Sequence, residues 1–152
     1  MKKNQLAELV STFFYAGYFP FAPGTFGSLI ALIIIWFLIP CFFYILVPIS
    51  IGLFFLSVWS ATRAEETFGK DGSPIVIDEV TGMVISLIFV PEDIKYFVGA
   101  FLLFRLFDII KLPPAQRMER LKGGWGVTLD DVIAGIYANL SLHLIIYFVN
   151  LR

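Results

Sequence analysis

The chain alternates between long apolar runs and short polar segments that contain proline or glycine. Five apolar runs are long enough to form helices, at about residues 23–40, 42–62, 74–90, 94–112 and 129–148. These runs are too long and too continuously apolar to be the alternating strands of a β-barrel. The pattern therefore predicts an all-α protein, with one further short helix within Leu6–Tyr18.

Composition changes this picture from a soluble bundle to a membrane protein. Hydrophobic residues make up 59% of the 152 residues and charged residues only 15%, whereas soluble domains are about 25% charged. We therefore expect a single membrane-embedded domain, residues 1–152, that forms an integral membrane bundle of about five embedded helices. The short N-terminal helix would lie at the membrane surface. The balanced net charge of −1 argues against a nucleic-acid partner.

Two of the runs, 23–40 and 74–90, are shorter than the roughly 20 residues of a full crossing. We expect them to thin the membrane locally or to start in a recess lined by protein. Lysine and arginine in the loops predict the orientation, because they are enriched on the cytoplasmic side. The predicted cytoplasmic set is Lys2, Lys3, Arg63, Lys70, Arg117, Arg120 and Lys122, against Lys95 and Arg152 on the other side.

Carboxylates lie near the ends of three of these runs, all on the predicted cytoplasmic face: Asp78, Glu79, Asp108, Asp130 and Asp131. Each costs about 2.5–3.5 kcal/mol to place in a membrane helix. Against Arg105 and Lys111, the five acids leave a formal charge of −3. A shared cation would offset this cost, and an all-oxygen ligand set favours Mg²⁺ over Zn²⁺.

A simpler interpretation is open for each of these features. Either acidic pair could only complement a helix N-terminus, and neighbours on a helix diverge by about 100°, so one of each pair need face a site. Arg105, Asp108 and Lys111 have i, i+3, i+6 spacing and could form intrahelical salt bridges. Gly24 and Thr25 begin a helix that could bind an anion or could simply be capped by Thr25. Together these groups suit phosphoryl chemistry on a lipid at the cytoplasmic membrane surface.

Four stretches resemble the phosphatidylglycerophosphatase A family, in the family's order and over most of the chain. They are PGTFGSL (23–29), DGSPIVIDEVTG (71–82), FRLFDIIKLPP (104–114) and GGWGVTLDDVIAG (123–135). Any one is a weak signal, whereas four together are specific. The resemblance implies an all-helical enzyme of phospholipid biosynthesis, multi-pass in the inner cell membrane with its active site facing the cytoplasm. It would hydrolyse phosphatidylglycerophosphate to phosphatidylglycerol and phosphate, with Mg²⁺ as cofactor.

The resemblance also implies roles for the matching positions. The candidate metal ligands are Asp78, Glu79, Asp108, Asp130 and Asp131. The candidate catalytic residues are Asp78, Glu79, Asp108 and Asp131. The candidate substrate-binding residues are Gly24, Thr25, Arg105 and Lys111. The implied partners are the phospholipid substrate and the surrounding membrane lipids, and the oligomeric state is open.

Two other classes of protein compete with the enzyme. A small multi-pass transporter or ion-conducting protein could carry an interfacial carboxylate cation site, but it predicts polar residues through the bilayer midplane. In this sequence the ionisable groups gather at one face and only His143 lies deep in a run. A non-catalytic scaffold, whose charged residues set packing, predicts that Asp78→Asn would be tolerated.

Overall fold

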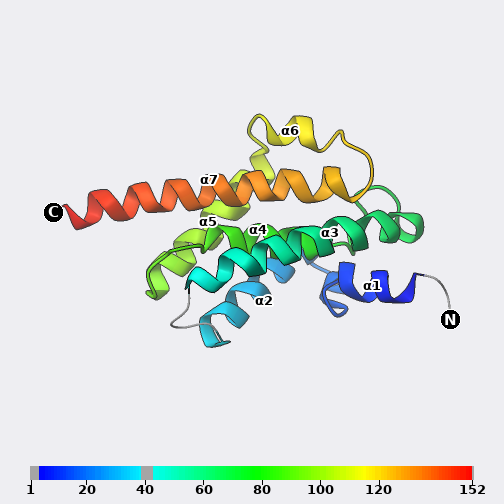
Figure 1. Ribbon diagram of the computed structural model, residues 1–152, viewed down its shortest axis with the longest axis horizontal. Helices are drawn as coiled ribbons and strands as arrows, with labels where there is room; N and C mark the ends of the chain where they lie inside the picture. Colours follow the sequence, from blue (N-terminus) through cyan, green and yellow to red (C-terminus); the bar gives the residue numbers. More distant parts are fainter. Residues whose placement is uncertain (1–3, 39–42, 152) are drawn as a thin grey trace.

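The computed structural model describes residues 4–38 and 43–151, and within them it is all-helical (Figure 1). The longer helices are α2 (Pro23–Leu38), α3 (Leu46–Phe68), α4 (Ile77–Ser86), α5 (Ile94–Ile110) and α7 (Gly124–Asn150). The shorter ones are α1 (Gln5–Ser11), η1 (Ala16–Tyr18), η2 (Phe43–Ile45) and α6 (Ala115–Met118). A helix therefore lies at each predicted position, and the all-α prediction is confirmed. Lys2, Lys3 and Arg152, used for the orientation, lie outside the described residues.

Proline fixes several of the helix ends. Pro23 is the first residue of α2, where its missing N–H and preset φ suit a helix start. Pro48 lies in the first turn of α3, which begins at Leu46. α5 ends at Ile110, just before Pro113 and Pro114, and Lys111 closes it in a left-handed conformation with φ of 50°.

α7 begins at Gly124, five residues earlier than the apolar pattern predicts. The backbone N–H of Gly124 donates a hydrogen bond of 2.8 Å to the hydroxyl of Thr62 on α3. A Cβ on Gly124 would collide with the carbonyl of Val58, so only glycine permits this close approach to α3. The cap comes from a residue 62 positions away, and for that reason hydrophobic periodicity does not reveal it.

α4 is the central helix and packs against α2, α3, α5 and α7 (Figure 1). Most of its side chains are buried, including the polar ones of Asp78, Thr81 and Ser86. It ends at Ser86, before the predicted limit near residue 90. The side-chain amide of Asn139 on α7 donates to the carbonyls of Ser86 (3.1 Å) and Ile88 (2.8 Å), which satisfies this buried helix end.

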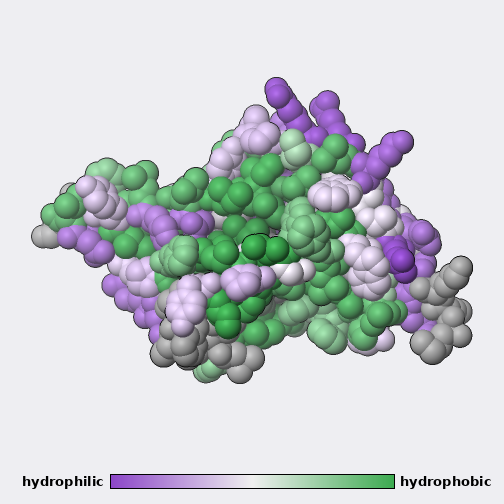
Figure 2. All heavy atoms as spheres, viewed as in Figure 1, coloured by the Kyte–Doolittle hydropathy of each residue, from purple (hydrophilic) through white to green (hydrophobic). Residues whose placement is uncertain are grey.

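The outer surface of the molecule is apolar over most of its length. Among the described helices, α3 and α7 are long and apolar enough to cross a membrane. Large side chains on four helices are exposed, for example Phe37 (72%), Phe55 (61%), Leu102 (60%) and Leu144 (58%). Figure 2 shows one face of the molecule, with hydrophobic residues over its middle and hydrophilic residues mainly toward its ends. This distribution fits a membrane-associated protein.

Candidate metal centre

Two glycines bring the acidic residues of α4 and α7 together. A Cβ on Gly135 of α7 would collide with the backbone carbonyl of Gly82 on α4, so the two helices cross in direct backbone contact. Asp78 lies one turn before Gly82, and Asp131 lies one turn before Gly135. The crossing point therefore fixes the separation of these two carboxylates.

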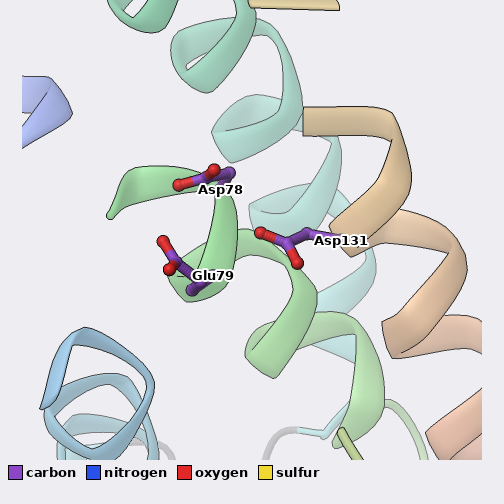
Figure 3. A group of neighbouring side chains, drawn as sticks. All are labelled: Asp78, Glu79 and Asp131. Atoms are coloured by element: carbon purple, nitrogen blue, oxygen red, sulfur yellow. The ribbon is translucent and has the colours of Figure 1, made fainter. Parts of the chain in front are cut away.

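Asp78, Glu79 and Asp131 point into one space between α4 and α7 (Figure 3). One oxygen atom from each of the three carboxylates lies within 4.8 Å of the other two. Asp78 and Asp131 are buried, with 4% and 3% of their surface exposed, and Glu79 is partly buried. The sequence expectation that one residue of each acidic pair faces the site holds for Asp131, whereas both Asp78 and Glu79 reach it.

No described cation forms an ion pair with these three carboxylates. Asp78 Oδ1, Glu79 Oε2 and Asp131 Oδ1 are buried and accept no hydrogen bond. Buried like charges need a cation or protons. Three carboxylates that converge on one space are the oxygen ligands that a hard divalent cation prefers, so they could hold a metal ion.

Asp130 is oriented differently from its neighbour. Its Oδ2 atom lies 2.8 Å from Nζ of Lys111, which also lies 3.3 Å from Oε1 of Glu119. Burial alone would lower the pKa of Lys111, but the hydrogen bond and charge of Asp130, with the charge of Glu119, outweigh it and raise the pKa above its usual value. Lys111 therefore stays protonated, and its charge is largely committed to Asp130.

Arg105 and Asp108 form the intrahelical ion pair that their spacing allows, with 2.8 Å between Nη1 and Oδ2. The pair lies beside the three carboxylates, close enough for both of its charges to act on Glu79 and for Asp108 to act on Asp131. Nε of Arg105 is buried and has no hydrogen-bond partner, whereas Nη1 is in contact with Asp108. The guanidinium thus keeps a donor that an anion could use.

The first turn of α2 lies against the same centre. A Cβ on Gly24 would collide with Oε1 of Glu79, so a larger residue at this position would force the carboxylate to move. Because α2 begins at Pro23, Thr25 lies inside the first turn rather than before it. A helix N-terminus carries a partial positive charge and unpaired N–H groups, which favour an anion.

Asp71 is a nearby carboxylate outside the set of site residues predicted from the sequence. It lies in the loop before α4, with φ of 51°, and its charge acts on both Asp78 and Asp130. Its own N–H donates to Oε1 of Glu65 at 3.3 Å. The only signal for it in the sequence is its place at the start of the DGSPIVIDEVTG stretch, because it lies outside the apolar runs.

These features define an all-helical protein with a buried carboxylate centre suited to a divalent metal ion. The sequence profile of the phosphatidylglycerophosphatase A family matches residues 9–146, so the chain belongs to that family. The resemblance drawn from the four sequence stretches is therefore confirmed, and family membership makes the chain a phosphatase.

Similar proteins cover nearly the whole chain. A protein of Bacteroides thetaiotaomicron, provisionally named phosphatidylinositol-3-phosphatase, is 40% identical over 88% of this chain and 89% of its own. The phosphatidylglycerophosphatase A of Escherichia coli is 32% identical over 95% of this chain and 86% of its own. That of Haemophilus influenzae is 34% identical over 93% of this chain and 89% of its own. No solved structure is significantly similar to the chain.

Proposed function

We propose that this protein hydrolyses phosphatidylglycerophosphate to phosphatidylglycerol and phosphate, with Mg²⁺ as its cofactor. The observation that carries the proposal is the set of three converging carboxylates, Asp78, Glu79 and Asp131, none of which is in an ion pair with a described cation. The second support is the family, two of whose members are named for this activity.

Each part of the site has a role in this proposal. Asp78, Glu79 and Asp131 hold the metal, while Asp108 and Asp130 support it from their ion pairs with Arg105 and Lys111. A bound Mg²⁺ supplies positive charge where negative charge builds up during phosphoryl transfer. The chain's own phosphate-binding groups are the first turn of α2 and Arg105, whose buried Nε has no hydrogen-bond partner.

The attacking water needs a base, and the centre provides one. A carboxylate oxygen of the centre accepts the proton of this water as it attacks phosphorus and the P–O ester bond breaks, and this proton then passes to the leaving alkoxide to give phosphatidylglycerol. Thr25, in the turn of α2 next to Glu79, positions the phosphate through its hydroxyl. The ammonium of Lys111 acts on the phosphate only at longer range, since it is paired with Asp130.

We also propose the membrane placement predicted from the sequence: about five embedded helices in the inner cell membrane, with the metal centre facing the cytoplasm. Two helices of sufficient length, the exposed apolar side chains and a lipid substrate support it. α4, at 10 residues, is too short to cross and would enter only partway, enclosed by its neighbours.

One relative favours a second lipid substrate. The Bacteroides thetaiotaomicron protein is named for a phosphatidylinositol 3-phosphate activity. Both lipids carry a phosphomonoester on a headgroup polyol that a phosphodiester joins to diacylglycerol, so the carboxylate centre alone does not separate them.

The test is phosphate release by purified protein from each lipid, with Mg²⁺ and with EDTA. We expect release from phosphatidylglycerophosphate, its loss in EDTA and its return when Mg²⁺ is added back. Faster release from phosphatidylinositol 3-phosphate would move the substrate assignment to that lipid. Release that is unchanged in EDTA would refute the metal-dependent mechanism, and no release from either lipid would refute the proposed function.

A further inference from the structure

The segment between α5 and α7, residues 112–123, carries an excess of positive charge. It holds three cations, Arg117, Arg120 and Lys122, and a single acid, Glu119. All three cations are exposed, and none forms an ion pair with another residue of the described chain. Glu119 is paired with Lys111 instead, at 3.3 Å. The charge of the three cations is therefore not offset, and we call them, together with Leu121, the basic ledge.

The segment is held against α7 at several points. Ala115 is buried, and the hydroxyl of Tyr137 on α7 donates a hydrogen bond of 2.7 Å to the carbonyl of Pro113. A Cβ on Gly126 of α7 would collide with the carbonyl of Leu121, so the backbone of the ledge touches the backbone of this helix. The fold therefore fixes where the three cations lie.

The ledge lies at the level of the metal centre, on the side of the bundle. Lys111 bridges Glu119 and Asp130, and Asp130 is the neighbour of Asp131 in α7. α6 lies alongside the first part of α7 rather than beyond its end (Figure 1). Hydrophilic side chains project outward there (Figure 2). Because α7 is long enough to cross a membrane, a segment displaced sideways from it would meet the surrounding lipid.

An exposed apolar side chain within the ledge favours a lipid over a soluble anion. Leu121 lies between Arg120 and Lys122 and is 42% exposed. At a membrane surface the leucine can enter the acyl region, while the two cations keep their charged ends at the level of the phosphates. Anionic lipids attract cations in this position. A soluble anion would use the cations but leave the leucine in water.

We propose that the basic ledge binds the headgroups of anionic phospholipids beside the metal centre. The inference rests on the membrane placement given under the proposed function, but not on the reaction itself. Phosphatidylglycerophosphate is an anionic lipid with both a phosphomonoester and a phosphodiester. The ledge would therefore concentrate such a substrate next to the site in a membrane that consists mainly of zwitterionic lipid.

The test measures which lipid lies next to the ledge, without any catalytic readout. With Cys41→Ser as background, Leu121→Cys carries a fluorophore, and the protein is reconstituted in phosphatidylcholine vesicles. Phosphatidylserine or phosphatidylcholine with a nitroxide near the glycerol is then added as the quencher. Phosphatidylserine is anionic and is neither substrate nor product of the proposed reaction. The quenching lipid is present in both leaflets, so the result does not depend on the orientation of the protein.

We expect the labelled protein to bind phosphatidylserine about fivefold more strongly than phosphatidylcholine, which is the attraction of about one cation near a membrane surface. This preference should disappear at about 1 M salt, where charges are screened beyond about 3 Å. Replacing all three cations of the ledge by glutamine should remove it. Exchanging them for the other cation, in Arg117→Lys, Arg120→Lys and Lys122→Arg together, should keep it.

Three outcomes would overturn the ledge proposal alone: equal quenching by the two lipids, a preference that persists at high salt, or a preference that survives the glutamine substitutions. The salt series needs no substitution of the cations, so it decides the question even if the glutamine variant fails to fold. No quenching by either lipid would overturn the ledge proposal and the membrane placement together. Phosphate release by the same protein, measured separately, decides the proposed reaction.

Discussion

Asp78, Glu79 and Asp131 differ from the other buried acids in having no described cation as a partner. Asp108 pairs with Arg105 and Asp130 pairs with Lys111, each at 2.8 Å. The three remaining carboxylates gain nothing from packing that offsets their loss of hydration. The proposed binding of a divalent cation would offset this cost, which a structural role alone does not.

The first prediction concerns stability in the absence of metal. Asp131→Asn removes a buried charge while keeping the shape of the side chain, so in EDTA it should raise the free energy of unfolding by about 1–3 kcal/mol. Mg²⁺ should stabilise the unmodified protein increasingly as its concentration rises above its dissociation constant, but should not stabilise the variant. Thermal denaturation in detergent, with and without Mg²⁺, measures both effects.

Asp93→Asn is the matched control for this experiment. Asp93 lies at the start of α5, where its side chain accepts a hydrogen bond from the N–H of Lys95, and asparagine caps a helix equally well. Its response to Mg²⁺ should equal that of the unmodified protein. Equal stabilisation of Asp131→Asn by Mg²⁺ would contradict a metal role for Asp131.

The second prediction concerns the ion pair of Lys111 with Asp130. Lys111→Met leaves Asp130 buried without a cation and should destabilise the fold by about 1–3 kcal/mol, less than for a fully buried pair because the Lys111 side chain is 26% exposed. Adding Asp130→Asn should recover most of this loss. A double-mutant cycle by chemical denaturation measures the coupling, and purely additive effects would show that the pair contributes nothing.

At the scale of single residues, the sequence predicts which residues lie near the carboxylate centre better than it predicts what each one contacts. The five acids, Arg105 and the glycine-containing start of α2 all lie at or beside the centre. The sequence does not reveal that Lys111 is paired with Asp130 rather than free for phosphate, because this contact depends on how α5 and α7 are placed. Asp71 is missed for a similar reason, since it reaches the site through the path of a loop.

At the scale of the helices, the crossing of α4 and α7 determines the site. Gly82 and Gly135 allow backbone contact, and the carboxylates one turn earlier are brought together as a result. The Thr62 hydroxyl and the Asn139 amide fix the start of α7 and the end of α4. Apolar periodicity predicts that these helices exist, but not these ends, because the partners are distant in sequence.

The third prediction tests this crossing. Gly135→Ala should destabilise the protein by about 1–3 kcal/mol, because the new methyl group forces α7 away from the carbonyl of Gly82. It should also weaken the Mg²⁺-dependent rise in melting temperature. Gly52→Ala on α3 is the control: a Cβ there meets nothing within 4 Å, so helix propensity should stabilise the protein by up to about 1 kcal/mol. Equal effects of the two substitutions would contradict the close crossing.

At the scale of the whole molecule, the proposed orientation rests on the charged residues between the apolar helices. Lys70, Arg117, Arg120 and Lys122 lie in the segments between the longer helices, and Arg63 lies toward the C-terminal end of α3. The all-α class follows from the sequence, because long apolar runs leave few alternatives. The depth of each helix in a membrane does not follow from the sequence. α4 is enclosed by other helices, whereas α3 and α7 are long enough to cross.

The fourth prediction tests this orientation. With Cys41→Ser as background, a membrane-impermeant thiol reagent should label Glu92→Cys in intact cells but label Lys122→Cys only after the membrane is opened. Glu92 lies in the turn before α5, and Lys122 lies in the loop before α7. The opposite labelling pattern would place the metal centre on the outer face.

The most direct test of the central claim is phosphate release from phosphatidylglycerophosphate, measured across Mg²⁺ concentrations for four proteins. These are the unmodified protein, Asp78→Asn, Asp131→Asn and the control Asp93→Asn. We expect both site variants to lose at least about 100-fold in kcat/KM at saturating Mg²⁺, while Asp93→Asn matches the unmodified protein. Release by Asp78→Asn and Asp131→Asn at the unmodified rate, with the same Mg²⁺ dependence, would contradict a shared catalytic metal centre.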